Sequence, residues 1–225
     1  GDWQAEFETE ALVYYERYAD DTVGFFGGNV DNLADDKTIV GDGYAVALSA
    51  PLSGTQAITV SYGTNTATLD VNSTRYQSSY GGTTYYLYPV DMLTTGTDTA
   101  TTNFYHSVSI NGRTYQFNPY FAKTVTTGST AGSVPGTVYL RTARHLYELS
   151  RHYDDLAAAT VNTTFRQERD INYAAYGWTT YTSSTDTVTS QAPIHSAANT
   201  ADVSDTGGFR AAYNGDYHTI QGVSF

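Results

Sequence analysis

Hydrophobic and polar residues alternate over much of the first 125 positions. Residues 2–10 alternate apolar or threonine positions with aspartate, glutamate and glutamine, which is the period of two expected for a β-strand. The β-rich runs 11–18 and 22–26 flank a short acidic turn and predict a hairpin. The dipeptide Asn111-Gly112, between two further apolar runs, predicts a second hairpin.

Other strands are predicted between segments rich in Gly, Asp, Asn and Ser. They cover residues 38–40, 44–48, 57–62, 66–71, 83–88, 104–110, 113–117 and 121–125. Short strands at this spacing favour a mostly β fold, and residues 1–125 are expected to form an antiparallel β-sandwich or barrel module.

A small, almost uncharged segment at residues 126–136 separates two styles of sequence and is expected to be a linker or boundary loop. The segment 137–225 begins with a strand and continues into one amphipathic helix, predicted at residues 142–156. Thr142 occupies the position of an N-cap. His145 stands at the third helical position where a capping box would have Glu, so no capping box is expected.

The polar face of this helix is the predicted partner-binding site, because a rigid helix presents side chains at a low ordering cost. Solvent exposure is expected for its residues, which are Arg144, His145, Glu148, Arg151 and His152. The two histidines lie about two turns apart, so they are a poor pair of ligands for one metal ion.

Composition narrows the possible functions. The chain has no cysteine, which excludes a disulfide framework and thiol catalysis. Its net charge of −12 argues against nucleic acid as a partner, since phosphate backbones would be repelled. No apolar run approaches the length of about 18 residues that a membrane span needs, so membrane insertion is not expected.

Catalytic and cofactor motifs do not stand out. The sequence contains neither a HExxH nor a GxSxG pattern, and its adjacent aspartates are typical of solvated segments. The Asp/Asn cluster at residues 31–36 does not match the spacing of a calcium loop. We therefore expect a protein that is not an enzyme and that uses no cofactor or metal.

Tyrosine is the most unusual feature of the composition, with 21 residues against 2 Trp. The segment 84–88 places tyrosines on both faces of one predicted strand. Two interpretations stay open. Exposed tyrosines are good binding residues, but tyrosine can also fill a core that is poor in Leu and Ile.

The last 90 residues carry a resemblance. Residues 138–149 read as a strand followed by a helix, residues 165–172 end in Asp-Ile-Asn, and residues 208–225 run from Gly-Phe through Asn-Gly-Asp-Tyr-His-Thr-Ile to Val-Ser-Phe. Together with Trp178 and Pro193-Ile194, they resemble bacterial surface proteins with GLUG-type repeats. That resemblance implies the opening of a β-solenoid, although Asn-Gly-Asp-Tyr replaces the usual Asp-Gly-Asn-Gly. Residues 213–225 are expected to form one β-hairpin that packs on the 138–140 strand and on the apolar face of the helix.

The first part of the chain is similar to β modules in long surface proteins of gut clostridia, on the segments 11–20, 24–27 and 40–44. Some of those proteins resemble superantigen-like, immunoglobulin-binding proteins. The resemblance implies a Gram-positive cell-surface or cell-wall protein, and this chain is expected to be a fragment of it and a monomer. Its implied function is binding of a host protein, with antibody Fab as the leading candidate. A glycan-binding adhesin domain and a structural stalk are the alternatives.

Overall fold

The computed structural model describes residues 11–90, 104–128, 134–160, 162–178, 209 and 211–223. The fold is mostly β with a single α-helix among these residues, as predicted. The strand predicted at 2–10 and the Pro193-Ile194 motif lie outside the described residues. The chain divides into two compact units. The first contains residues 1–96, 107–119 and 123–131, and the second contains 97–106, 120–122 and 132–225.

Two antiparallel sheets build the first unit. The six-stranded sheet has the order β3-β2-β1-β4-β8-β7, and the five-stranded sheet has the order β11-β10-β9-β5-β6. The strands are β1 (Ala11–Tyr18), β2 (Val23–Gly27), β3 (Val30–Asp31), β4 (Ile39–Leu48), β5 (Ile58–Tyr62), β6 (Asn65–Leu69), β7 (Tyr76–Tyr80), β8 (Thr83–Val90), β9 (His106–Ile110), β10 (Arg113–Phe117) and β11 (Thr126–Thr127).

Both predicted hairpins are confirmed. Strands β1 and β2 pair antiparallel with Arg17 opposite Val23. Strands β9 and β10 are neighbours in the five-stranded sheet. Asn111 and Gly112 between them have φ angles of 46° and 82°. A two-residue turn with both φ values positive matches the right-handed twist of the strands that it joins.

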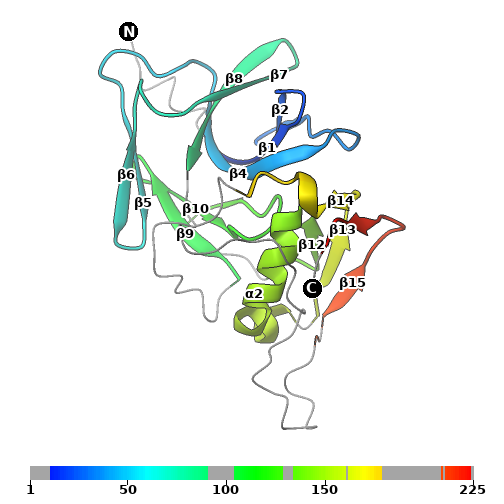
Figure 1. Ribbon diagram of the computed structural model, residues 1–225. Coiled ribbons are helices and arrows are strands. Elements are labelled where there is room, and N and C mark those ends of the chain that lie inside the picture. Colours follow the sequence, from blue (N-terminus) through cyan, green and yellow to red (C-terminus); the bar gives the residue numbers. More distant parts are fainter. Residues whose placement is uncertain are drawn as a thin grey trace. The chain divides into compact units, whose positions relative to one another are not determined.

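The six-stranded sheet curls into a half-barrel (Figure 1), and side chains link its two ends. The Oδ1 of Asn32 accepts the backbone N–H of Phe25 at 2.7 Å, while its Nδ2 donates to Ser78 Oγ at 2.8 Å. The Ser78 hydroxyl in turn donates to the carbonyl oxygen of Val23. Polar side chains therefore join β2 to β7, which do not pair with each other as strands.

Tyrosine serves as a core residue with a satisfied hydroxyl in this unit. Tyr14 and Tyr88 are 0% and 1% exposed. The Tyr14 hydroxyl donates to the carboxylate of Glu16, and the Tyr88 hydroxyl accepts the backbone N–H of Leu52. Tyr44 contacts the ring of Phe117 edge to face, at 5.0 Å between centroids. Buried hydroxyls with partners favour the interpretation of these tyrosines as core filler.

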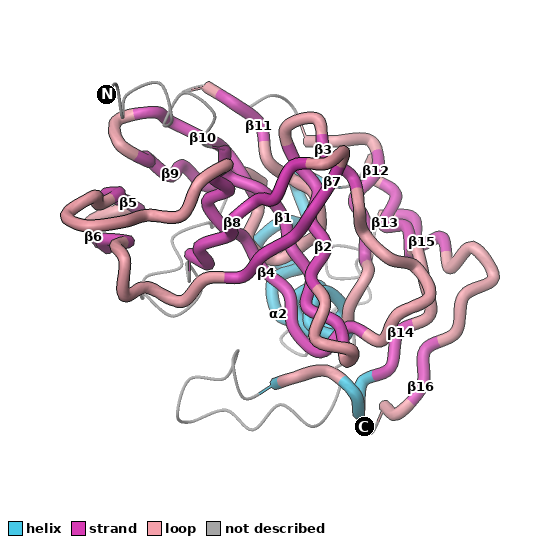
Figure 2. The backbone as a smooth tube through the Cα atoms, turned by 90° about the horizontal axis from the view of Figure 1, so that it is seen from above, coloured by secondary structure: helices cyan, strands magenta, loops and turns pink. Residues whose placement is uncertain are grey.

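The second unit pairs its strands in parallel (Figures 1 and 2). One sheet has the order β12-β13-β15, and a two-stranded sheet joins β14 to β16. The elements are β12 (Thr137–Leu140), α2 (Ala143–Thr160), β13 (Thr164–Gln167), β14 (Ile171–Asn172), the short 3-10 helix η1 (Tyr173–Ala175), β15 (Ala212–Asn214) and β16 (Ile220–Gln221).

The hairpin predicted at residues 213–225 is wrong. Strand β15 pairs in parallel with β13, and β16 pairs in parallel with β14. The chain therefore runs through successive coils, each adding a strand beside the equivalent strand of the coil before it. We call β13 with β14 the second coil and β15 with β16 the third coil.

Two further differences concern the segments around residue 125. Residues 121–125 do not form the predicted strand, and only Ala122 forms an isolated antiparallel bridge, with Tyr139. Within the expected loop 126–136, Thr126 and Thr127 form β11 and pair with β10. Residues 129–133 lie outside the described residues.

Candidate binding surface at the open edge of the parallel strands

Equivalent positions in the three parallel strands differ sharply in exposure. Val138, Phe165 and Tyr213 stand side by side in register across β12, β13 and β15. Their exposed fractions are 2%, 0% and 37%. Phe165 has a strand on each side, whereas no described strand pairs with β15 on its outer side. Tyr213 is therefore half-covered where its counterpart is buried.

The two-stranded sheet shows the same contrast. Ile171 in β14 is in register with Ile220 in β16, and their exposed fractions are 2% and 43%. A third large side chain, that of Tyr217, lies in the loop between β15 and β16 and is fully exposed at 104%. We call the outer side of the third coil, which carries Tyr213, Tyr217 and Ile220, the open edge.

Some backbone N–H and C=O groups of the open edge also point outward. The N–H of Ala212 donates to the Thr163 carbonyl oxygen, and the N–H of Ile171 donates to the Thr219 carbonyl oxygen. In a parallel ladder, alternate residues of one strand direct their N–H and C=O groups to opposite neighbours. The amide groups of Tyr213 and Ile220 therefore point away from the second coil.

A buried amide holds the third coil on the second. Gln167 is 1% exposed, and its Nε2 donates to the carbonyl oxygens of Arg169 and Thr219 at 3.0 and 2.9 Å. Its Oε1 accepts the hydroxyl of Tyr213 at 2.8 Å. Desolvation raises the pKa of that hydroxyl to about 12, so Tyr213 stays a hydrogen-bond donor at neutral pH.

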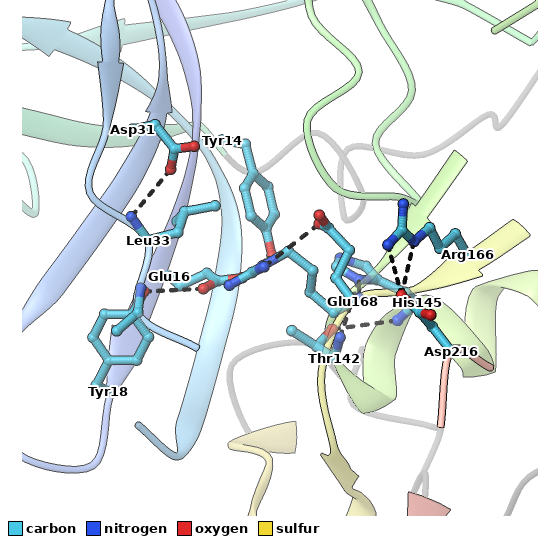
Figure 3. A network of polar contacts seen from close by, with 12 residues as sticks. Tyr14, Glu16, Tyr18, Asp31, Leu33, Thr142, His145, Arg166, Glu168 and Asp216 are labelled. Carbon is cyan, nitrogen blue, oxygen red and sulfur yellow. Dashed lines mark hydrogen bonds and ion pairs between the residues drawn. The ribbon is translucent and has the colours of Figure 1, made fainter. Parts of the chain in front are cut away.

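Charged side chains of the second coil fix the loop between β15 and β16. The Oδ1 of Asp170 accepts the backbone N–H of Thr219 at 2.9 Å and lies 3.4 Å from Nδ1 of His218. The Thr219 N–H lowers the pKa of Asp170, and His218 adds to this effect. Arg166 donates through Nε and one terminal nitrogen to Oδ2 of Asp216, the latter at 2.6 Å (Figure 3).

The backbone of this loop is strained at Tyr217. The Oδ1 of Asn214 accepts the N–H of Asp216 at 3.0 Å, which starts the turn. Asp216 and Tyr217 then adopt φ angles of 47° and 63°. Left-handed backbone is tolerated by Asp but is unusual for a bulky aromatic residue. The loop thus keeps a fully exposed tyrosine at a position where glycine would be less strained.

A second tight turn follows β16. Gly222 has a φ of 71°, and a Cβ built on it would lie 3.0 Å from the backbone nitrogen of Ala174 in η1. Glycine is therefore required here both by the backbone conformation and by the close approach of η1.

The prediction of a solvated helix face is wrong for three of its five residues. Arg144, His145 and Glu148 are 1%, 0% and 1% exposed, whereas Arg151 is exposed and His152 is intermediate. Burial is possible for His145 and Glu148 because both have polar neighbours inside the second unit. Whether any of the five contacts a partner stays a prediction.

His145 completes a capping box after all (Figure 3). Its Nδ1 accepts the backbone N–H groups of Arg141 and Thr142 at 2.8 and 3.1 Å. In return, the His145 N–H donates to Oγ1 of Thr142 at 3.4 Å. The imidazole therefore performs the role that a Glu carboxylate has in the usual capping box. Because Nδ1 accepts, the proton of the neutral ring is assigned to Nε2.

His152 and Arg151 each contact another side chain of α2. Nε2 of His152 lies 2.9 Å from Oε2 of Glu148, one turn away, and the His152 ring stacks on Tyr120 at 3.9 Å between centroids. Arg151 donates to the hydroxyl of Tyr147 at 3.1 Å. Among the described residues, no three His, Asp or Glu side chains gather as metal ligands would.

The residues of the open edge were not predicted as a site. The available signal was Tyr217, which the resemblance expected from the sequence aligns with a glycine of GLUG-type repeats. Exposure of Tyr213 and Ile220 could not be read from the sequence, since both occupy positions that suit a buried strand.

The chain matches no family model, no curated protein and no solved structure. Within the described part of the chain, α2 is not apolar enough over its length to cross a membrane.

Proposed function

We propose that this chain is a non-enzymatic, protein-binding segment of a bacterial surface protein and that it binds through the open edge. The observation that carries the proposal is Tyr217, which combines full exposure with a φ of 63°. Strain of this kind costs about 1–3 kcal/mol and is found where function requires it. A tyrosine with no core role at such a position is best explained by contact with a partner.

The surroundings of Tyr217 support a role in protein recognition. Its loop is held by the Arg166–Asp216 ion pair and by the Asp170–Thr219 hydrogen bond, so little ordering is needed on binding. Tyrosine is enriched among the residues that dominate the energy of protein interfaces. Tyr213 and Ile220 are two further exposed apolar side chains of the third coil.

The partner proposed from the sequence is antibody, bound through Fab by a protein at the surface of a Gram-positive bacterium. That choice rests on the resemblance of the first part of the chain to immunoglobulin-binding surface proteins. The alternative is a glycan, because a fully exposed tyrosine ring also suits stacking on a sugar face. The parallel coils support the resemblance to GLUG-type repeats only in their general architecture.

The test is binding of purified polyclonal Fab and Fc to the immobilised chain, with a mucin glycan array in parallel. We expect Fab to bind, Fc not to bind, and Tyr217→Ala to weaken Fab binding at least tenfold, which corresponds to about 1.4 kcal/mol or more and is the direction expected for a tyrosine at the centre of an interface. Tyr80→Ala is the matched control, because Tyr80 is an exposed tyrosine in the first unit.

The results separate the candidates. Fab binding that is equal in the parent and Tyr217→Ala would remove the open edge as the binding site. Binding to glycans but not to Fab would replace antibody with the alternative ligand. If neither Fab nor glycans bind, the structural stalk is the remaining alternative, since it predicts neither activity.

A further inference from the structure

We propose that the open edge binds its partner by strand addition, in which an extended segment of the partner protein pairs with β15 or β16. This inference rests on the proposed function and deepens it by naming the form of the ligand. It follows from the backbone of the open edge rather than from Tyr217.

The required hydrogen-bonding groups are already in place. The N–H and C=O groups of Tyr213 and Ile220 point away from the second coil, as the bonds of Ala212 and Ile171 show. The side chains at the same two positions are the half-exposed ones, at 37% and 43%. An added strand would satisfy the amides and cover the side chains together, which is how peptide segments extend exposed sheet edges.

The second coil supplies the template for such a complex. Phe165 and Ile171 occupy the equivalent positions there and are buried, because the third coil pairs along them in register. The proposed interface therefore continues a contact that the molecule already makes. An occupant with the same chemistry would carry an aromatic or β-branched residue opposite Tyr213 or Ile220.

The two edge strands of the three-stranded sheet, β12 and β15, differ in how far they are covered. The outer side of β12 is partly covered, because the N–H of Ala122 donates to the Tyr139 carbonyl oxygen. Among the described residues, no comparable segment covers β15 or β16. An edge strand without a described neighbour, as β15 is in this sheet, is a place where a partner strand can add.

The probe for this experiment is a fluorescent synthetic peptide with the sequence of residues 211–222, which copies the third coil. Binding to the intact chain is followed by fluorescence anisotropy. Two variants of the chain separate the backbone from the side chain. Ile220→Pro removes the outward N–H but keeps the inward bonds of Thr219 and Gln221, whereas Ile220→Ala keeps the N–H and removes most of the side chain.

We expect saturable binding to the parent chain and binding to Ile220→Pro at least about tenfold weaker than to Ile220→Ala, as loss of a ladder hydrogen bond and a steric block predict. Far-ultraviolet circular dichroism of each variant shows that it is folded. A peptide carrying Ile220→Asp is the matched control and should not bind.

Three outcomes would overturn the proposal. The first is no saturable binding to the parent. The second is equal binding to the Pro and Ala variants. The third is sedimentation that shows the parent as a dimer through Ile220, since a second copy would then occupy the edge.

The peptide assay uses no Fab, so its result does not depend on whether antibody is the partner. Conversely, Fab binding that is weakened by Tyr217→Ala but unchanged by Ile220→Pro would support the proposed function and contradict strand addition.

Discussion

The hydroxyl of Tyr213 donates a hydrogen bond to Oε1 of Gln167, and this contact joins two residues that are 46 positions apart. Gln167 is buried, so removing the donor leaves its carbonyl oxygen short of one partner. We expect Tyr213→Phe to lower the free energy of unfolding by about 1–3 kcal/mol, measured by urea denaturation. Tyr217→Phe is the control, since its hydroxyl is fully exposed, and a similar loss there would contradict the explanation.

Glycine at position 217 should stabilise the protein. The φ of 63° strains a tyrosine but not a glycine, and the Tyr217 ring has no burial to lose. We expect Tyr217→Gly to raise the free energy of unfolding by roughly 1 kcal/mol and to weaken binding of the partner. Gly222→Ala provides the opposite case, because a Cβ there meets η1 as well as a positive φ. A lower melting temperature for Tyr217→Gly would show that the loop is not strained.

The capping box of α2 predicts a coupled effect of two substitutions. Thr142→Ala and His145→Ala each remove one direction of the reciprocal contact, and a lost cap typically costs about 0.5–2 kcal/mol. His145→Ala adds the cost of a cavity because its ring is buried. Thermal unfolding of the two single variants and the double variant should show non-additive losses. Strictly additive losses would mean that the two side chains act independently.

The contact between Asp170 and Thr219 predicts sensitivity to acid. The backbone N–H of Thr219 lowers the pKa of Asp170 below its ordinary value of 3.8. A depressed pKa in the folded state contributes stability that is present above the unfolded value and is lost as the pH falls through the folded value. Asp170→Asn should therefore be less stable than the parent at neutral pH, and the gap should close below about pH 4. A gap that is constant from pH 7 to pH 3 would argue against this ionised contact.

Closure of the half-barrel can be tested at Asn32. Its side chain bonds to Phe25 on one side and to Ser78 and Ser79 on the other. Asn32→Asp keeps the acceptor for the Phe25 N–H but loses the two donated bonds, whereas Asn32→Ala loses all three. We expect both to destabilise the first unit, and Ala by about 1 kcal/mol more than Asp. Equal losses in chemical denaturation would show that the Phe25 contact contributes nothing.

Local signals in the sequence predicted local structure well. The turn at Asn111-Gly112 and the β1–β2 hairpin need only neighbouring residues to specify them, and both are confirmed. The hairpin expected at 213–225 failed because an Asn-Gly pair is also compatible with the looser turn that begins at Asn214. The true partners of β15 and β16 lie far back in the sequence, where no local pattern can indicate them.

The helix shows a different limit of sequence patterns. Its apolar face was predicted, and Ala143, Leu146 and Leu149 are buried as expected. The opposite face was expected in solvent because it is polar, yet His145 and Glu148 are buried with polar neighbours. Periodicity identifies which side chains share a face, but it does not show whether polar groups on that face satisfy one another. The open edge could not be predicted either. The exposure of a residue in a strand depends on whether that strand lies at the edge of its sheet, and the local pattern does not show this.

The parallel coils have a consequence for how the chain folds. Asp170 and Thr219, which tie the third coil to the second, are 49 positions apart in the sequence. A long loop must close before either partner gains this contact, and closure of long loops slows folding. The antiparallel hairpins of the first unit and the capped helix have no such delay. We therefore expect the third coil, which carries the proposed binding surface, to assemble later than those hairpins and the helix.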